Sequence, residues 1–179
     1  VWAQGATAAS LNKDGWLDVV LSDYGPNTTI LKNNHVDGFT AYQAIAGADA
    51  KQHLRWGGSS VAGNDYLGNG KTQLVVTDNG CEAAACSSST NIHMYSWDIG
   101  ATGTPNADKL VFTFEKNLPR STLAHAYLAI NKDFDASGKN SLIVFSRPND
   151  SGVKQSAIQF LKNNGAGDFT DVTSSMLQG

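Results

Sequence analysis

Oxygen-bearing side chains stand at alternating positions 10, 12, 14 and 18 of the segment Ser10–Asp18, which leads directly into a run of aliphatic, mostly β-branched residues. Ca²⁺ is a hard cation that takes about six to eight oxygen ligands, and alternate side chains of a tightly curled loop can all point to one centre. Gly15 permits the sharp turn that such a loop needs, because glycine reaches a positive φ angle without steric cost. The spacing therefore predicts a calcium site with the ligands Ser10, Asn12, Asp14 and Asp18, to which Trp16 adds its backbone carbonyl oxygen.

The residues after this loop indicate which class of calcium loop it is. An EF-hand loop closes with a bidentate Glu and continues into a helix. Leu21 stands at that closing position, and the segment Val19–Leu21 favours a strand. The loop is therefore predicted to open a β-strand, which also argues against a dockerin-type module because that module needs helices.

The pattern occurs three times along the chain, aligned on Gly15, Gly70 and Gly138. A second block, Leu-Lys-Asn-Asn followed by Phe-Thr, occurs in residues 31–40 and again in residues 161–170. Two blocks that recur in the same order indicate an internal repeat, which is the strongest clue to the architecture.

The three copies differ in the residues at their ligand positions. The second copy has Leu67 and Gln73 at two of them, which does not favour metal there. The alternative for every copy is a loop of Asx turns that holds its own backbone without an ion. In the third copy the corresponding ligands are Asp133, Asp135, Ser137, Lys139 and Ser141.

Each copy is predicted to form a small antiparallel sheet. In the first copy we expect strands over residues 17–21, 28–32 and 39–45, with a fourth strand from residues 54–61. Four short strands in about 40–60 residues are typical of a β-propeller blade. The predicted fold class is all-β, with three repeats of four-stranded blades and little helix. The repeats are expected to cover approximately residues 1–48, 49–118 and 119–179.

The chain resembles the FG-GAP/VCBS repeat family of integrin-type β-propeller blades, whose signature is D-x-[DN]-x-[DN]-G-x-x-D before a hydrophobic strand. The resemblance covers essentially the whole chain as three copies. It includes the small-residue segment 57–63 before the second loop and the Asn-Asn…Gly-Asp-Phe-Thr-Asp-Val-Thr ending at Thr173. The resemblance implies Ca²⁺ as the cofactor and a secreted or cell-surface location.

The resemblance also implies an adhesive, glycan-binding, protein-binding or structural module, and the alternative is the propeller part of a secreted polysaccharide-active enzyme. Propellers have about four to eight blades. Three repeats are too few, so we expect further blades from the same or from other chains to complete the propeller.

Composition agrees with an extracellular all-β protein. A net charge of −3 provides no basic face, which argues against nucleic acid as a partner. No apolar run approaches the roughly 20 residues of a membrane helix. Cys81 and Cys86 lie in a polar segment and suit a local disulfide in an oxidising compartment, with two free thiols as the alternative.

The sequence shows no catalytic constellation. The four histidines are scattered without metal-binding or nucleophile-activating spacing, which argues weakly against an enzyme. Exposed aromatic residues could stack on sugars, or the same residues could pack between blades. The aromatic candidates are Trp16, Tyr24, Trp56 and Trp97.

Overall fold

The structure is a computed structural model that describes residues 3–11, 14–23, 29–46, 58–78, 92–99, 110–120, 125–147 and 156–178. Within these residues the chain forms twelve strands and one four-residue helix. The elements are β1 (Ala3–Ala9), β2 (Asp18–Asp23), β3 (Thr29–Asn33), β4 (Phe39–Ala46), β5 (Gly58–Asn64), β6 (Gln73–Asp78), β7 (Ile92–Ile99), β8 (Leu110–Leu118), β9 (His125–Lys132), β10 (Ser141–Arg147), β11 (Ala157–Asn163), β12 (Phe169–Asp171) and α1 (Thr173–Met176).

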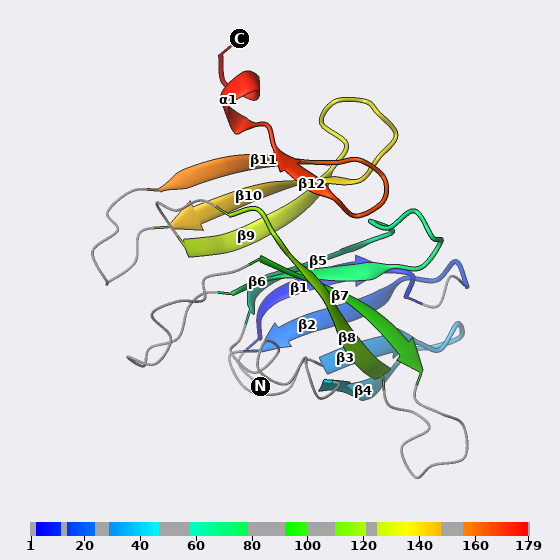
Figure 1. Ribbon diagram of the computed structural model, residues 1–179. Helices are drawn as coiled ribbons and strands as arrows, with labels where there is room; N and C mark the ends of the chain where they lie inside the picture. Colours follow the sequence, from blue (N-terminus) through cyan, green and yellow to red (C-terminus); the bar gives the residue numbers. More distant parts are fainter. Residues whose placement is uncertain are drawn as a thin grey trace.

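The strands form three four-stranded antiparallel sheets in chain order: sheet one (β1–β4), sheet two (β5–β8) and sheet three (β9–β12). A short parallel pairing between β4 and β8 joins sheets one and two at their outer strands. In Figure 1, β5 and β6 lie between sheet three at the top and sheet one below. The all-β prediction with repeated four-stranded sheets and little helix is confirmed.

The prediction that residues 54–61 supply the fourth strand of the first unit is wrong. Strand β5 pairs with β6 in sheet two, and β1 completes sheet one by pairing with β2. Each predicted calcium loop is thus the turn of a hairpin that opens its own sheet. The aliphatic run after each loop forms the second strand of that sheet, as the β-branched composition predicts.

The first strands of the sheets pack against one another in series, β1 against β5 and β5 against β9. Small residues permit this close approach, because a Cβ atom at Gly63 would lie 3.1 Å from the Cβ atom of Ala9. The space between sheets two and three holds the main apolar core. Its members are Ala62, Tyr66, Val75, Ile92, Met94, Leu118, Ala126, Ala129, Leu142, Val144, Leu161 and Phe169.

Equivalent positions in the three sheets differ in burial according to their place in the series. Val20 and Val75, five residues after the loop glycines, are fully buried, whereas Ile143 at the same position of sheet three is only half-buried. Opposite and beside Ile143, the side chains of Leu128, Ile130 and Phe145 are exposed. Successive residues of a strand point to opposite faces. The outward face of sheet three is therefore apolar and only partly covered by the described residues, of which Phe134 packs against Phe160.

In sheet one, at the other end of the series, it is the opposite face of the sheet that is incompletely buried. Val19 in sheet one is half-buried, whereas its equivalents Leu74 and Leu142 are fully buried in sheets two and three. Leu31, which is opposite Val19, is also half-buried. Both terminal faces of the described series are thus apolar and incompletely covered.

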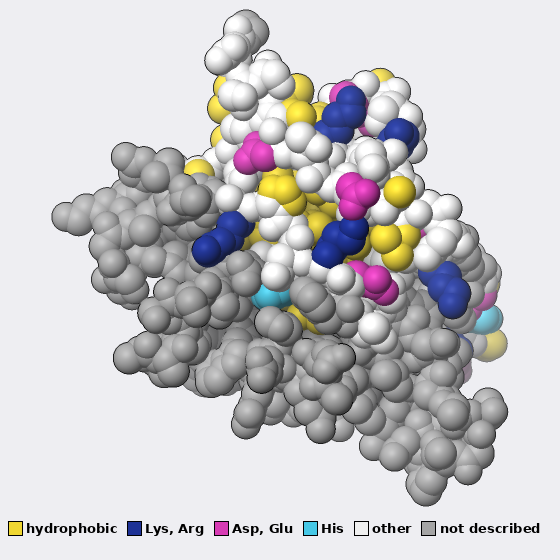
Figure 2. Space-filling view, viewed as in Figure 1, with side chains coloured by type: hydrophobic (Ala, Val, Ile, Leu, Met, Phe, Trp, Pro, Cys, Tyr) yellow, Lys and Arg dark blue, Asp and Glu magenta, His cyan; other side chains and the backbone are white. Residues whose placement is uncertain are grey.

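The surface carries charges of both signs. Figure 2 shows basic and acidic side chains interspersed on one face of the molecule. Lys116 of sheet two pairs with Asp168 of the β11–β12 turn at 2.6 Å, and this ammonium group lowers the pKa of Asp168. None of the helices in the described residues is long and apolar enough to cross a membrane.

Candidate metal loops

Three hairpin loops carry the residues predicted to bind calcium: loop one (residues 10–17), loop two (residues 65–72) and loop three (residues 133–140). They lie along the same side of the molecule, at the right in Figure 1. Gly15, Gly70 and Gly138 have φ angles of 86°, 84° and 75°, a region that other residues rarely adopt. The three loops therefore make the same turn at the glycine, as the repeated pattern predicts.

Asp18 closes loop one from the first residue of β2, and it is almost completely buried, with 1% of its surface exposed. Its Oδ2 atom accepts the backbone N–H of Leu11, and its Oδ1 atom accepts that of Asn33, both at 2.9 Å. The carboxylate thus joins loop one to the end of β3. An ionised carboxylate offers about four lone-pair sites. Two remain for a cation, so Asp18 has a structural role that does not prevent ligation.

Asp14 joins loop one to the β3–β4 turn. Its Oδ1 atom accepts the backbone N–H of Trp16, and its Oδ2 atom lies 2.6 Å from Nε2 of His35. The indole of Trp16 stacks on the His35 imidazole, with ring centroids 5.4 Å apart and planes 13° apart. A cation at Asp14 would therefore meet a histidine that already contacts the same carboxylate.

The environment of the Ser10 hydroxyl indicates whether loop one fits a cation. Its Oγ atom is buried and has no hydrogen-bond partner among the described residues. A buried hydroxyl without a partner is costly. A hard cation would satisfy this oxygen, and the donor set of hydroxyl, carboxylate and carbonyl oxygens suits Ca²⁺. The described residues of loop one therefore fit the ion. Asn12 lies outside the described residues.

Loop two is held by its own polar side chains. Asp65 accepts the backbone N–H groups of Asn69 and Gly70, at 3.1 and 2.7 Å. Gln73 is fully buried and contacts four further groups of the loop. Leu67, at a ligand position, packs against the apolar core instead.

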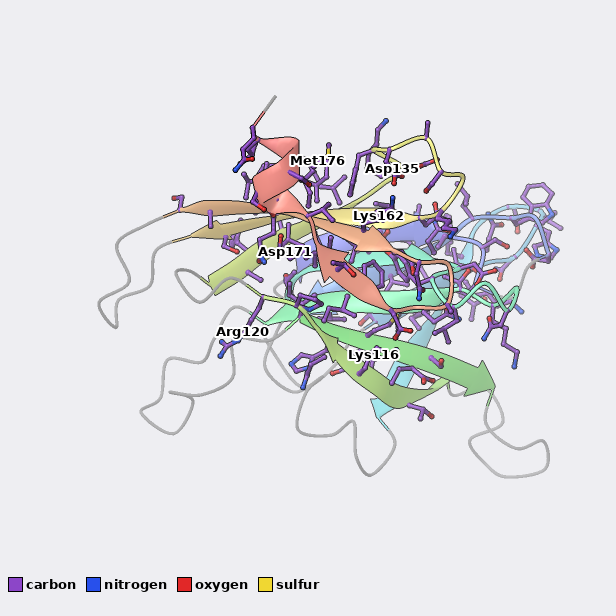
Figure 3. All side chains as sticks on the ribbon, turned by 45° about the horizontal axis from the view of Figure 1, so that its top comes forward. Lys116, Arg120, Asp135, Lys162, Asp171 and Met176 are labelled. Atoms are coloured by element: carbon purple, nitrogen blue, oxygen red, sulfur yellow. The ribbon has the colours of Figure 1, made fainter. Side chains whose placement is uncertain are left out.

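Loop three has two carboxylates, and a lysine contacts one of them. Asp133 accepts the backbone N–H groups of Ser137 and Gly138, at 3.0 and 2.8 Å. Asp135 pairs with the Lys162 ammonium at 2.7 Å, and this contact, with hydrogen bonds from Ser137, holds the pKa of Asp135 well below its usual range. Figure 3 shows Lys162 of β11 close to Asp135.

The other predicted ligands of loop three have protein partners as well. Ser141 Oγ accepts the backbone N–H of Asn163 at 3.1 Å. The Lys139 ammonium donates to the backbone carbonyl of Asn164 at 2.6 Å. A cation in loop three would have to compete with the Lys162 ammonium for Asp135.

Some of the predicted site residues lie within the described part of the chain, and others lie outside it. Within the described ranges, no three His, Cys, Asp or Glu side chains come together as a metal site. Trp16 is exposed rather than packed between sheets. The predictions for Cys81, Cys86, Tyr24 and Trp56, and for the side chain of Trp97, lie outside the described part of the chain.

Two asparagines at the ends of β3 and β11 shape these sites and were missed among the predicted site residues. The Asn33 N–H bonds to Asp18, and the Asn163 N–H bonds to Ser141, so the two interactions are equivalent. The side-chain carbonyl of Asn33 then accepts the N–H of His35, and that of Asn163 accepts the N–H of Gly165. The repeated Leu-Lys-Asn-Asn block could have indicated both asparagines, because it recurs after two of the three calcium-type loops.

Comparison with known proteins adds no family assignment. No protein-family model matches the chain, and no curated protein matches it. The likeness of the three loops to calcium loops therefore rests on the residues and contacts described above.

Proposed function

We propose that the chain is a calcium-binding module of the FG-GAP/VCBS type, secreted or at the cell surface, whose sheets are blades of a larger β-propeller. One observation carries this proposal: loop one combines the carboxylates of Asp14 and Asp18 with a buried Ser10 hydroxyl that has no described hydrogen-bond partner. Loops two and three lack this combination, because the equivalents of Ser10 are Asp65 and Asp133, and each of these carboxylates accepts two backbone N–H groups. Loop one is therefore the proposed calcium site.

Calcium is expected to raise the melting temperature of the wild-type protein by several degrees. An ion that binds only the folded state stabilises it by about 2.7 kcal/mol at 100 times its dissociation constant. For a chain of this size, each kcal/mol corresponds to roughly 2–4 °C. Asp14→Ala should remove most of the response, and Mg²⁺ should substitute poorly because it requires near-octahedral geometry. Differential scanning calorimetry with chelator, Ca²⁺ and Mg²⁺ measures these effects.

Asp14 is the informative position for this test because Asp18 also holds two backbone N–H groups. Asp37→Ala is the matched control, since it removes an exposed carboxylate from the neighbouring β3–β4 turn. The control should keep the full calcium response. A wild-type melting curve that is the same in chelator and in millimolar Ca²⁺ would refute the proposed site.

The two terminal sheet faces support the assembly part of the proposal. Val20 and Val75 are covered by the next sheet in the series, whereas Ile143 and its exposed neighbour Phe145 have no described sheet beyond them. The half-buried face of sheet one, around Val19 and Leu31, is the complementary end. We propose that the end faces of different copies pack together as sheets two and three do.

The surface around loop one is the proposed ligand-binding region. The side chains of Trp16 and Leu17 are exposed in loop one, and those of Val36 in the adjacent turn and Phe39 at the start of β4 are exposed as well. The contact between His35 and Asp14 holds the two segments together. An exposed indole offers a flat apolar face to the C–H groups of a sugar ring. A glycan is therefore the favoured ligand, with an extracellular protein as the alternative.

Trp16→Ala is expected to weaken glycan binding at least about tenfold, because buried aromatic anchors dominate such contacts. Binding of the fluorescently labelled protein to a glycan array identifies the ligand, and titration of that glycan measures the loss. Leu177→Ala, at an exposed residue near the C-terminus, is the control and should bind normally. Equal binding by Trp16→Ala and wild type would exclude this surface, and an array without bound glycans would leave protein as the ligand.

A further inference from the structure

Gln73 occupies the closing position of loop two, which Asp18 occupies in loop one and Ser141 in loop three. Its side chain is fully buried, so each polar atom of the amide needs a partner within the protein. Loop two contains one carboxylate, Asp65, and both of its oxygen atoms accept backbone N–H groups. The Gln73 amide is therefore the remaining polar group that can organise the loop interior.

The carbonyl oxygen of the Gln73 amide accepts backbone N–H groups of its loop, as the Asp18 carboxylate does in loop one. Gln73 Oε1 accepts the backbone N–H groups of Tyr66 and Leu67, at 2.8 and 2.9 Å. In loop one, Oδ2 of Asp18 accepts the N–H of Leu11, which is the equivalent of Tyr66. The oxygen atoms of the two closing side chains therefore have the same function.

The nitrogen half of the amide has no counterpart in loop one. Gln73 Nε2 donates to Oδ1 of Asn69 at 3.3 Å and to the backbone carbonyl of Lys71 at 2.7 Å. Asn69 aligns with Asp14, and Lys71 aligns with Trp16, whose side chain and carbonyl are two predicted calcium ligands of loop one. The two N–H groups thus point at the oxygen atoms that a cation would bind.

We propose that the Gln73 amide nitrogen replaces the cation in loop two, so that this loop keeps its shape without metal. The residue at the closing position then distinguishes loop two from loop one: the Asp18 carboxylate leaves room and charge for the ion, and the longer Gln73 amide fills the same place with two hydrogen-bond donors. This inference depends on the proposed role of such loops as cation sites, and the experiment separates the two.

Gln73→Asp in an Asp14→Ala background is expected to create a calcium response in loop two. The shorter carboxylate vacates the position of the nitrogen atom and adds a negative charge near Asp65. The matched control is Gln73→Asn in the same background, which vacates the same space without the charge. Both double variants should melt below Asp14→Ala in chelator, and Ca²⁺ should raise the melting temperature by several degrees only in the Asp variant.

The Asp14→Ala background removes the response of loop one, and any response of loop three is common to both double variants. A response in Gln73→Asp without one in the wild type would refute the proposed loop-one site and support this inference. A wild type that responds, with equal calcium effects in the two double variants, would overturn it.

Amide hydrogen exchange of the wild-type protein gives a second test that needs no variant. The N–H groups of Leu67 and Gly70, which are hydrogen-bonded within loop two, should gain no more protection from Ca²⁺ than the N–H groups of the core strands, because binding in loop one also slows exchange through global unfolding. The N–H groups of Leu11 and Trp16 in loop one should gain protection when Ca²⁺ binds. A larger gain of protection in loop two than in the core strands on addition of Ca²⁺ would show that loop two binds the ion itself and would overturn the inference.

Discussion

Tyr66→Ala is expected to lower the free energy of unfolding by about 3–5 kcal/mol, the usual cost of removing a large buried aromatic side chain. Tyr66 is completely buried in the core between sheets two and three. Its ring packs edge-on against Phe169, and its hydroxyl donates to Oδ1 of Asn131 at 2.8 Å. A domain is typically stable by about 5–15 kcal/mol. The variant should therefore lose a large part of its stability, which urea unfolding followed by circular dichroism can measure.

Tyr66→Phe is the matched control because it keeps the ring and removes the hydroxyl. The expected loss is about 1–3 kcal/mol, since Oδ1 of Asn131 is left without this donor. Burial raises the pKa of the Tyr66 phenol well above its ordinary value, so the hydroxyl remains a donor at all ordinary pH values. An alanine variant within 1 kcal/mol of wild type would mean that sheets two and three are not held by this core.

Phe145→Glu is expected to weaken association between copies of the chain by at least about 100-fold. Phe145 is 39% exposed on the outward face of sheet three, opposite Leu128. An unpaired charge in an apolar interface costs several kcal/mol, and each 1.4 kcal/mol is about a tenfold change in affinity. Because the side chain is partly exposed in a single copy, the change should affect folding much less. Sedimentation velocity over a range of concentrations measures the association.

Val36→Glu introduces the same charge at an exposed residue of the β3–β4 turn, outside the strands that form the two end faces. This control should associate like the wild type. The proposal predicts that the wild type forms a closed ring or a filament, because the two end faces are different surfaces and pack head to tail. A wild-type chain that remains monomeric at all concentrations would contradict assembly between copies.

The sequence predicted the parts of the fold that depend on local chemistry. A glycine after Asp, Asn or Ser, followed by a β-branched or aliphatic run, located the three hairpin turns and the strands β2, β6 and β10. The strand that completes sheet one, β1, was harder to predict. Residues 3–9 are mostly alanine, glycine and polar residues, which have weak strand propensity. They form a strand because β1 packs closely against β5, and close packing requires small side chains.

The candidate sites were predictable in position but not in their contacts. The spacing of Asp14 and Gly15 indicates a calcium-type loop, yet the approach of His35 depends on how the β3–β4 turn folds back over loop one. Lys162 likewise reaches Asp135 from another strand of sheet three. Gln73 was visible as a departure from the ligand pattern, but its role depends on the direction of its amide, which sequence spacing does not determine.

The parallel pairing of β4 with β8 also affects how the protein resists aggregation. A strand at the edge of a sheet offers unpaired N–H and C=O groups, which can recruit strands from other chains into amyloid-like assemblies. Residues 44–46 and 110–112 cover one another along part of the outer edges of sheets one and two. The outer edge of sheet three is β12, which has three residues and is separated from α1 by one residue. Among the described strands, this pairing and the shortness of β12 reduce the free backbone of the outer edges, so a concentrated solution of the protein has fewer templates for strand addition.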